Sequence, residues 1–239
     1  MPAKPLIKAL TEAGIGSRRR MAEAIKQGKV EVNGEIAESF NHPVNVGKDH
    51  ILFNGQAVDL MPDEIVCLMV NKPEGIVSTV SDEKGRRTVL DILPKKYQSY
   101  RLYPVGRLDK DTTGLLLLTN DGNLTYHLTH PRFEHEKEYL VSIRGNLRPE
   151  ERQRLEHGIR LEDGMTDTAI IREIAAPPFN YSITIHEGKK RQVHRMFERL
   201  GHPVLALKRV RIGNLRLGEL KEGEIRQLSA GEITALLSG

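Results

Sequence analysis

The chain has 239 residues, enough for one large domain or for a small and a medium one with buried cores. Its 38% hydrophobic and 28% charged content is typical of a soluble globular protein, and no run approaches the roughly 18 apolar residues of a membrane span. The N-terminal MPAKPLIKAL lacks the apolar segment of a signal peptide. Cys67 is the only cysteine, which excludes a disulfide framework and a thiolate metal cluster. We therefore expect a cytoplasmic protein.

The net charge of +4 conceals an uneven distribution of basic residues. Residues 1–30 contain seven Lys or Arg and two Glu, whereas residues 31–60 contain one Lys and five acids. Residues 189–211 contain eight Lys or Arg and one Glu. Such clusters are typical of faces that bind a phosphate backbone, although each one alone is also compatible with a solvated surface.

The first 60 residues have the pattern of two short helices followed by small hairpins. Residues 6–13 space apolar side chains at helical intervals and stop at Gly14, and Ser17 is a suitable N-cap for a second helix that stops at Gly28. This second helix leaves a basic set for the surface: Arg18, Arg19, Arg20 and Lys26. The strings KVEVNGEIAE and ILFNGQAV each predict strand, Asn-Gly turn and strand.

The string SRRRMAEAIKQGKVEVNG (17–34) closely resembles the small RNA-binding domain first described in small-subunit ribosomal protein four. In that family the basic second helix and the following turn bind structured RNA, so the resemblance implies RNA binding but no chemistry. We expect this domain at residues 1–60, with Asp59 to Glu64 as the linker and the remainder, residues 61–239, as a second domain.

From residue 64 onward, strands and helices alternate irregularly. The segments EIVCLMVNKP, GLLLLTN, EYLVSI, TAIIREI and YSITI predict strands, and helical patterns cover about 121–129, 149–157 and 191–200. This arrangement indicates an α+β domain around a large sheet. Cys67 lies inside an apolar strand and is expected to be an inert core residue.

The most informative stretch is YPVGRLDKDTTGLLLLTNDG (103–122). Residues 106–109 form a polar turn ahead of the apolar strand Leu115 to Leu118, where a carboxylate would be firmly held. Asp109 and Asp111 could form an acid/base pair of the glycosidase kind, or could merely cap backbone amides of the turn. Spacing alone favours the capping interpretation.

The segment GRLDKDTTGLLLLTNDG (106–122) closely matches the catalytic motif of the pseudouridine synthase family that modifies small- and large-subunit ribosomal RNA. NKPEGIVST (71–79) looks like the family's opening strand and HEKEYLVSI (135–143) like its tyrosine-bearing strand. HEGKKRQVHRMFERLG (186–201) is similar to its basic helix, and VLALKRVRIGNLRL (204–217) to the strand pair behind the site. The resemblance implies a large, mainly antiparallel mixed sheet with flanking helices. It covers nearly the whole chain.

The resemblance also implies roles for individual residues. Asp109 matches the catalytic aspartate, and Tyr139 matches a tyrosine that stacks on the flipped uracil and assists proton transfer from C5. Arg107 is expected to brace the gap that the flipped base leaves, and Leu207 to pack on the base, although Leu207 is equally compatible with plain core. The remaining RNA contacts are expected from the second basic cluster: Lys189, Lys190, Arg195, Lys208 and Arg209.

One position departs from the family pattern. The family usually has Arg or Lys where this chain has His194, to form an ion pair with the catalytic aspartate. A protonated His194 could still pair with Asp109, or its neighbour Arg191 or Arg195 could supply the charge. We favour a neighbouring arginine, because imidazole is shorter than the side chains it replaces.

The remaining motifs argue against cofactors. The group His127, His130 and His135 has no recognised zinc-ligand spacing, and the chain contains neither a phosphate-binding loop nor a dinucleotide motif. Isomerisation of uridine involves no redox change, so we expect no cofactor and no metal.

Together with the basic clusters, the resemblance implies an enzyme, expected to be a monomer, that isomerises a uridine of ribosomal RNA. The segment VLALKRVRIG resembles the large-subunit branch of the family more closely. The alternative is a non-catalytic RNA-binding or ribosome-assembly factor that keeps the fold. A carbohydrate-active enzyme would not explain the two basic clusters. Covalent and glycal routes remain equally compatible with these residues.

Overall fold

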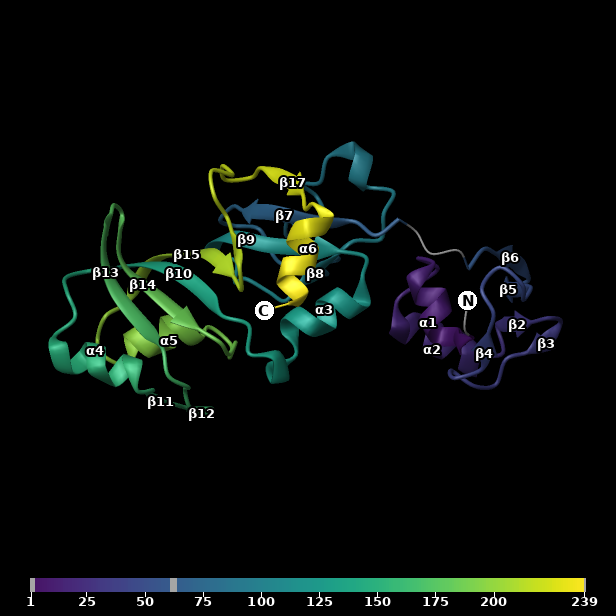
Figure 1. Ribbon diagram of the computed structural model, residues 1–239, viewed down its shortest axis with the longest axis horizontal. Coiled ribbons are helices and arrows are strands. Elements are labelled where there is room, and N and C mark those ends of the chain that lie inside the picture. Colours follow the sequence, from purple (N-terminus) through teal and green to yellow (C-terminus); the bar gives the residue numbers. More distant parts are fainter. Residues whose placement is uncertain (1–2, 61–63, 239) are drawn as a thin grey trace. The chain divides into compact units, whose positions relative to one another are not determined.

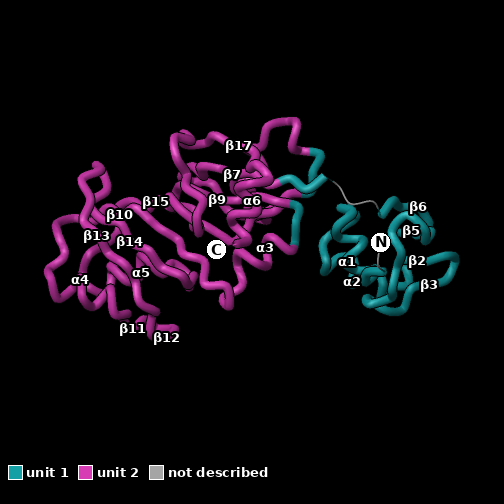
Figure 2. The backbone as a smooth tube through the Cα atoms, viewed as in Figure 1, with its two compact units in different colours: residues 1–66, 99–101, 120–122 teal, residues 67–98, 102–119, 123–239 magenta. Residues whose placement is uncertain are grey.

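The computed structural model describes residues 3–60 and 64–238 and divides into two compact units (Figures 1 and 2). The first contains the chain up to residue 66 with the short segments 99–101 and 120–122, and the second contains the rest. Part of the predicted linker, residues 61–63, lies outside the described residues.

The first unit has the predicted helices and hairpins. Helices α1 (Leu6–Glu12) and α2 (Arg18–Lys26) accompany an antiparallel four-stranded sheet in the order β3 (Glu35–Ile36), β2 (Val30–Val32), β5 (Ile51–Phe53) and β6 (Gln56–Val58). A small pair, β1 (Lys4–Pro5) and β4 (Pro43–Val44), completes it. The Ser17 hydroxyl caps α2 by accepting from the Arg20 amide at 3.1 Å. Asn33 and Asn54 have φ near +50°, as the two-residue hairpin turns require.

The second unit is built on a nine-stranded sheet. Its main path runs β13 (Ile170–Ala176), β14 (Phe179–Ile185), β10 (Lys137–Ile143), β15 (Val204–Ile212), β9 (Thr112–Thr119), β7 (Cys67–Lys72) and β17 (Ile225–Gln227). Strand β16 (Leu215–Arg216) pairs with β15, and β8 (Tyr103–Val105) pairs with β9. These pairs are antiparallel except for β15 with β9, which is parallel, so the predicted α+β class with a mixed, mainly antiparallel sheet is confirmed.

Helices and small elements flank this sheet (Figure 1). They are α3 (Gly122–Thr129), α4 (Pro149–Glu156), α5 (Gln192–Glu198), α6 (Ala230–Leu237), the 3-10 turns η1 (Lys95–Tyr97) and η2 (Pro131–Phe133), and the hairpin β11 (Arg160–Leu161) with β12 (Gly164–Met165). None of the helices in the described part of the chain is long and apolar enough to cross a membrane.

Strand β9 occupies the middle of the sheet. Leu115 to Leu118 are fully buried, as expected for a strand covered on both faces, and Cys67 on β7 is also buried. Gly114 allows the close parallel approach of β9 to β15, because a Cβ there would lie 2.7 Å from the Arg209 amide nitrogen. The loop before β9 is therefore held beside β15.

The expectation that residues 71–79 continue a strand is wrong. Strand β7 ends at Lys72, and Pro73 makes the extended ladder end there because proline donates no backbone hydrogen bond. The following residues form a loop that turns back toward residues 106–112. Strand β17 and helix α6 were not predicted.

Candidate active site

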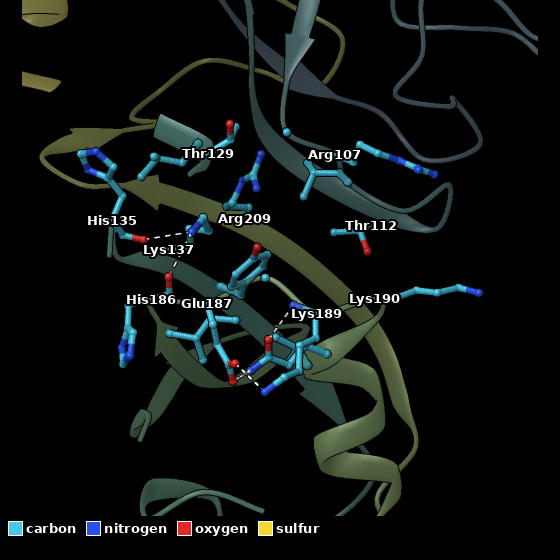
Figure 3. Close-up of a pocket in the computed structure, with 18 of the residues that line it drawn as sticks. Arg107, Thr112, Thr129, His135, Lys137, His186, Glu187, Lys189, Lys190 and Arg209 are labelled. Carbon is cyan, nitrogen blue, oxygen red and sulfur yellow. Dashed lines mark hydrogen bonds and ion pairs between the residues drawn. The ribbon is translucent and has the colours of Figure 1, made fainter. Parts of the chain in front are cut away.

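A pocket of about 770 Å³ opens between the loop 106–109, strands β10 and β15, the segment leading into α5, and the end of α3. Figure 3 shows His135 and Thr129 toward one end of this pocket and Lys189 and Lys190 toward the other. Several residues with expected chemical roles line it together: Arg107, Asp109, Tyr139, Arg191, His194, Leu207 and Arg209. These residues come from four segments that are far apart in the sequence.

Asp109 lies on the loop between β8 and β9 and is partly buried. Its backbone carbonyl accepts from the Thr112 amide at 3.1 Å, so the peptide group closes the turn into β9. The Ser78 hydroxyl donates to the Leu108 carbonyl at 2.9 Å and lies 3.2 Å from the Leu108 amide, which donates back to it. Asp109 and Arg107 also line a second hollow of about 580 Å³, toward residues 77–86. The loop thus presents its acid to open space while its backbone is fixed.

Lys72 supports this loop from beneath, a role that the sequence reading missed. It is fully buried, and its ammonium donates to the carbonyls of Pro73, Lys110 and Thr112 at 2.9, 3.3 and 2.8 Å. Burial lowers the pKa of Lys72 to about 8, while the nearby carboxylates of Asp111 and Asp109 raise it. The NKP sequence at the end of an apolar strand could have indicated this role, because a lysine inside a buried strand needs an internal partner.

The basic residues at the start of α5 contact Asp111 rather than Asp109. Arg191 donates to both carboxylate oxygens of Asp111 at 3.0 and 2.9 Å, and the His194 Nε2 lies 3.8 Å from the same carboxylate. Burial raises the pKa of Asp111, but the Arg191 hydrogen bonds outweigh this and leave it lowered. Arg195 is ion-paired with Asp163 at 2.8 Å, because one turn further along α5 it faces the β11–β12 hairpin. The expected arginine partner of Asp109 is therefore paired elsewhere in this structure.

His194 is 5% exposed, and its Nδ1 makes no hydrogen bond among the described residues. Burial lowers its pKa, and the neighbouring Arg191 lowers it further. Both effects favour the uncharged form of His194. Arg191 has φ of +48°, an uncommon backbone conformation for a residue other than glycine, which turns the chain into α5.

Strands β10 and β15 form the wall behind Asp109. Tyr139 lies opposite Arg209 in the register, with the guanidinium carbon 6.0 Å from the ring centroid. Arg209 is 3% exposed and donates from Nε to the Leu115 carbonyl at 2.8 Å. Leu207 is buried at the pocket surface, consistent with either a base contact or plain core. Burial and the charge of Arg209 lower the pKa of Lys137, two residues before Tyr139, to about 8.

The other predicted RNA-binding residues are distributed over both units. Arg18, Arg19, Arg20 and Lys26 are exposed on α2, with Arg20 and Lys26 near the rings of Phe53 and Phe40. Lys190 is exposed at the pocket, whereas Lys189 is ion-paired with Glu187 at 2.7 Å. Lys208 is half-buried on β15.

The histidine group does not have the arrangement of a metal site. His127 and His135 contact each other at 3.3 Å between Nδ1 and Nε2, and His130 accepts from the Arg132 amide. In the described part of the chain no group of three or more His, Cys, Asp or Glu could hold a metal ion.

Comparisons with known proteins identify both units. Residues 66–199 match the family model described as RNA pseudouridylate synthase, and residues 4–58 match the S4 domain. The chain is 42% identical to the ribosomal large subunit pseudouridine synthase B of Bacillus subtilis, over 97% of this chain and 94% of that protein. It is 38% identical to an uncharacterized RNA pseudouridine synthase of Aquifex aeolicus, over 96% of this chain and 92% of that protein.

A solved structure agrees with this result. A crystal structure described as a pseudouridylate synthase superimposes with a TM-score of 0.69 at 35% identity, covering 98% of this chain and 99% of that one. The fold of this chain is thus that of a solved pseudouridylate synthase over nearly its whole length. The chain belongs to the RNA pseudouridylate synthase family and carries an N-terminal S4 domain.

Proposed function

We propose that this enzyme isomerises a uridine of large-subunit ribosomal RNA and that Asp109 is its catalytic carboxylate. The observation that carries this is the convergence of Asp109, Tyr139 and Leu207 on one pocket from three separate segments. The Bacillus subtilis relative, named for the large subunit, supports the choice of RNA.

The reaction breaks the N1–C1′ bond, turns the uracil, forms the C5–C1′ bond and moves the C5 proton, so substrate and product are isomers. Asp109 supplies the negative charge, or the nucleophile, at the sugar or at uracil C6. The target base has to leave its stack to reach this carboxylate, which costs a few kcal/mol. Arg107, exposed at the rim of both hollows, braces the vacated position in the RNA.

Tyr139 and the basic residues have supporting roles in this scheme. The Tyr139 ring is largely buried against the wall and stacks on the flipped uracil, and its hydroxyl assists transfer of the C5 proton. Arg191 and His194 stand beside the acidic loop, where Arg191 provides the permanent positive charge. Lys189, Lys190, Arg195, Lys208 and Arg209 contribute RNA contacts around this centre.

The two parts of the chain have different roles in this proposal. Residues 1–60 bind RNA through Arg18, Arg19, Arg20 and Lys26, and residues 61–239 carry out the chemistry. The enzyme works as a cytoplasmic monomer without metal or nucleotide cofactor. The alternative is an assembly factor that binds RNA without modifying it.

Mapping pseudouridines in large- and small-subunit ribosomal RNA from cells with and without the gene tests this proposal. We expect a large-subunit position to lose its pseudouridine on deletion and to regain it when the parental gene is returned. An unchanged map of both RNAs would contradict the proposal and favour the assembly factor.

A further inference from the structure

Five aromatic side chains and one guanidinium gather where α3 passes into η2 and β10. They are Tyr126, His127, His130, Arg132, Phe133 and His135, called here the ring cluster. The cluster contains three of the nine histidines of the chain and two of its eleven Phe and Tyr residues. None of these six residues takes part in the proposed reaction.

The rings of the cluster hold one another in place. His127 stacks on Phe133 with centroids 3.9 Å apart and planes 26° apart, and its Nδ1 lies 3.3 Å from the Nε2 of His135. Tyr126 lies 4.8 Å from the His130 ring. The Arg132 guanidinium carbon is 4.4 Å from the Phe133 centroid and 5.0 Å from that of Tyr126.

The cluster is not required to anchor α3. Leu124 and Leu128, which are 1% and 3% exposed, already pack this helix against the core. Tyr126, two residues from each, lies on another face of the helix and is 47% exposed. His130 and Arg132 are also exposed. A tyrosine and an arginine kept against each other in solvent are the groups that stack on nucleobases.

The cluster adjoins the pocket that contains Asp109. Thr129, His130, Pro131 and His135 line that pocket, and Figure 3 shows Thr129 and His135 along one edge of it. When a uridine is extruded into the pocket, the bases beside it lose a stacking partner. A neighbouring base that moves toward this edge therefore meets the exposed Tyr126 ring and the Arg132 guanidinium beside it.

We propose that the ring cluster is a stacking platform for an unpaired RNA base near the target uridine. Tyr126 and Arg132 form its contact surface, and His127, Phe133 and His135 support it from below. The ligand is a nucleobase rather than a phosphate alone, because rings recognise the π-face that every base offers. This inference rests on the proposed function in taking RNA as the ligand and the Asp109 pocket as the place of the target uridine.

The absence of tryptophan from the sequence permits a direct test. Tyr126→Trp introduces a single indole at the platform, and Ile170→Trp introduces one at an exposed site on β13 as a matched control. Each full-length variant is titrated with a decauridylate and with an abasic ribose-phosphate decamer of the same length. We expect the decauridylate, but not the abasic decamer, to quench the fluorescence of Tyr126→Trp. In the control Ile170→Trp, the two decamers should have the same effect on the fluorescence.

Kinetics on unmodified large-subunit ribosomal RNA provides the second arm. We expect Tyr126→Ala to raise KM at least fivefold with little change in kcat, and Tyr126→Phe, which retains a ring, to recover most of that affinity. Equal quenching by the two decamers, no quenching by either, or an unchanged KM for Tyr126→Ala would overturn the platform. If the parental enzyme showed no turnover on this RNA, the proposed function would be contradicted. The platform would still be tested by the quenching experiment, because quenching requires no catalysis.

Discussion

Replacing Lys72 with methionine tests whether the buried ammonium holds the catalytic loop. The side chains have similar length, but Met donates no hydrogen bond, so the carbonyls of Pro73, Lys110 and Thr112 lose their shared donor. Three buried carbonyls left without a donor cost about 6 kcal/mol at about 2 each. Methionine avoids the cost of burying an ammonium, which is roughly 4 kcal/mol and is the reason that the pKa of Lys72 is lowered, so this gain offsets part of the loss. We expect Lys72→Met to lower the free energy of unfolding by about 2 kcal/mol.

The effect on catalysis should be larger than the effect on stability. Two of the three carbonyls belong to the segment that follows Asp109, and a displacement of about 1 Å in a catalytic group can cost about a hundredfold in rate. Urea unfolding measures the stability, and single-turnover isomerisation at saturating enzyme measures the rate. Lys110→Met, which removes an exposed lysine from the same loop, is the matched control and should resemble the parent.

The pH dependence gives a second signature of Lys72. Its folded pKa of about 8 lies below the ordinary lysine value of 10.5, so between these two pH values the unfolded chain binds a proton that the folded chain has released. The parental free energy of unfolding should therefore rise between pH 8 and 10.5. Lys72→Met should show a smaller rise than the parent. Part of the rise should remain, because the pKa of Lys137 is also lowered to about 8. Unchanged stability, pH slope and turnover in Lys72→Met would refute the supporting role.

Three further outcomes are expected. Gly114→Ala should lower the free energy of unfolding, measured in urea, by at least about 2 kcal/mol. The φ of +100° and the backbone clash with Arg209 each cost about 1–3 kcal/mol, and a loss under about 1 kcal/mol would contradict this. Replacing Arg18, Arg19 and Arg20 by glutamine should weaken RNA binding and reduce the dependence of the affinity on salt concentration. Binding isotherms at several salt concentrations measure this dependence. If it were equal in parent and variant, these arginines would not contact the RNA. His194→Ala should retain at least a tenth of parental activity, whereas Arg191→Ala should lose about a hundredfold. Because burial lowers the pKa of His194, the parental rate should not fall above pH 7 through deprotonation of this histidine. A pH–rate profile that shows such a fall, and its absence in His194→Arg, would show that the charged histidine is required.

The sequence predicted the elements whose signals are local. Ser17, Asn33-Gly34 and Asn54-Gly55 determine a helix start and two turns through their own backbone preferences, and the apolar run Leu115 to Leu118 identifies the central strand. The Ser229 and Glu232 capping box of α6 was equally readable, but the short C-terminal helix was not predicted.

The contacts of the site were not readable in the same way. Motif order placed Asp109 and Tyr139 together, but which acid Arg191 reaches depends on the path of the chain between residues 111 and 191. The role of Lys72 depends on a return of residues 110–112 over the end of β7. Such pairings are set by tertiary packing, about which residue spacing carries no information.

The most direct test of the central claim is single-turnover isomerisation by Asp109→Asn on unmodified large-subunit ribosomal RNA. Asparagine preserves the size of the side chain but cannot act as a carboxylate, so turnover should vanish while RNA affinity stays within a few-fold of the parent. Asp111→Asn, two residues along the same loop, serves as the comparison and should retain measurable turnover. If Asp109→Asn kept more than about a tenth of parental turnover, Asp109 would not be the catalytic carboxylate.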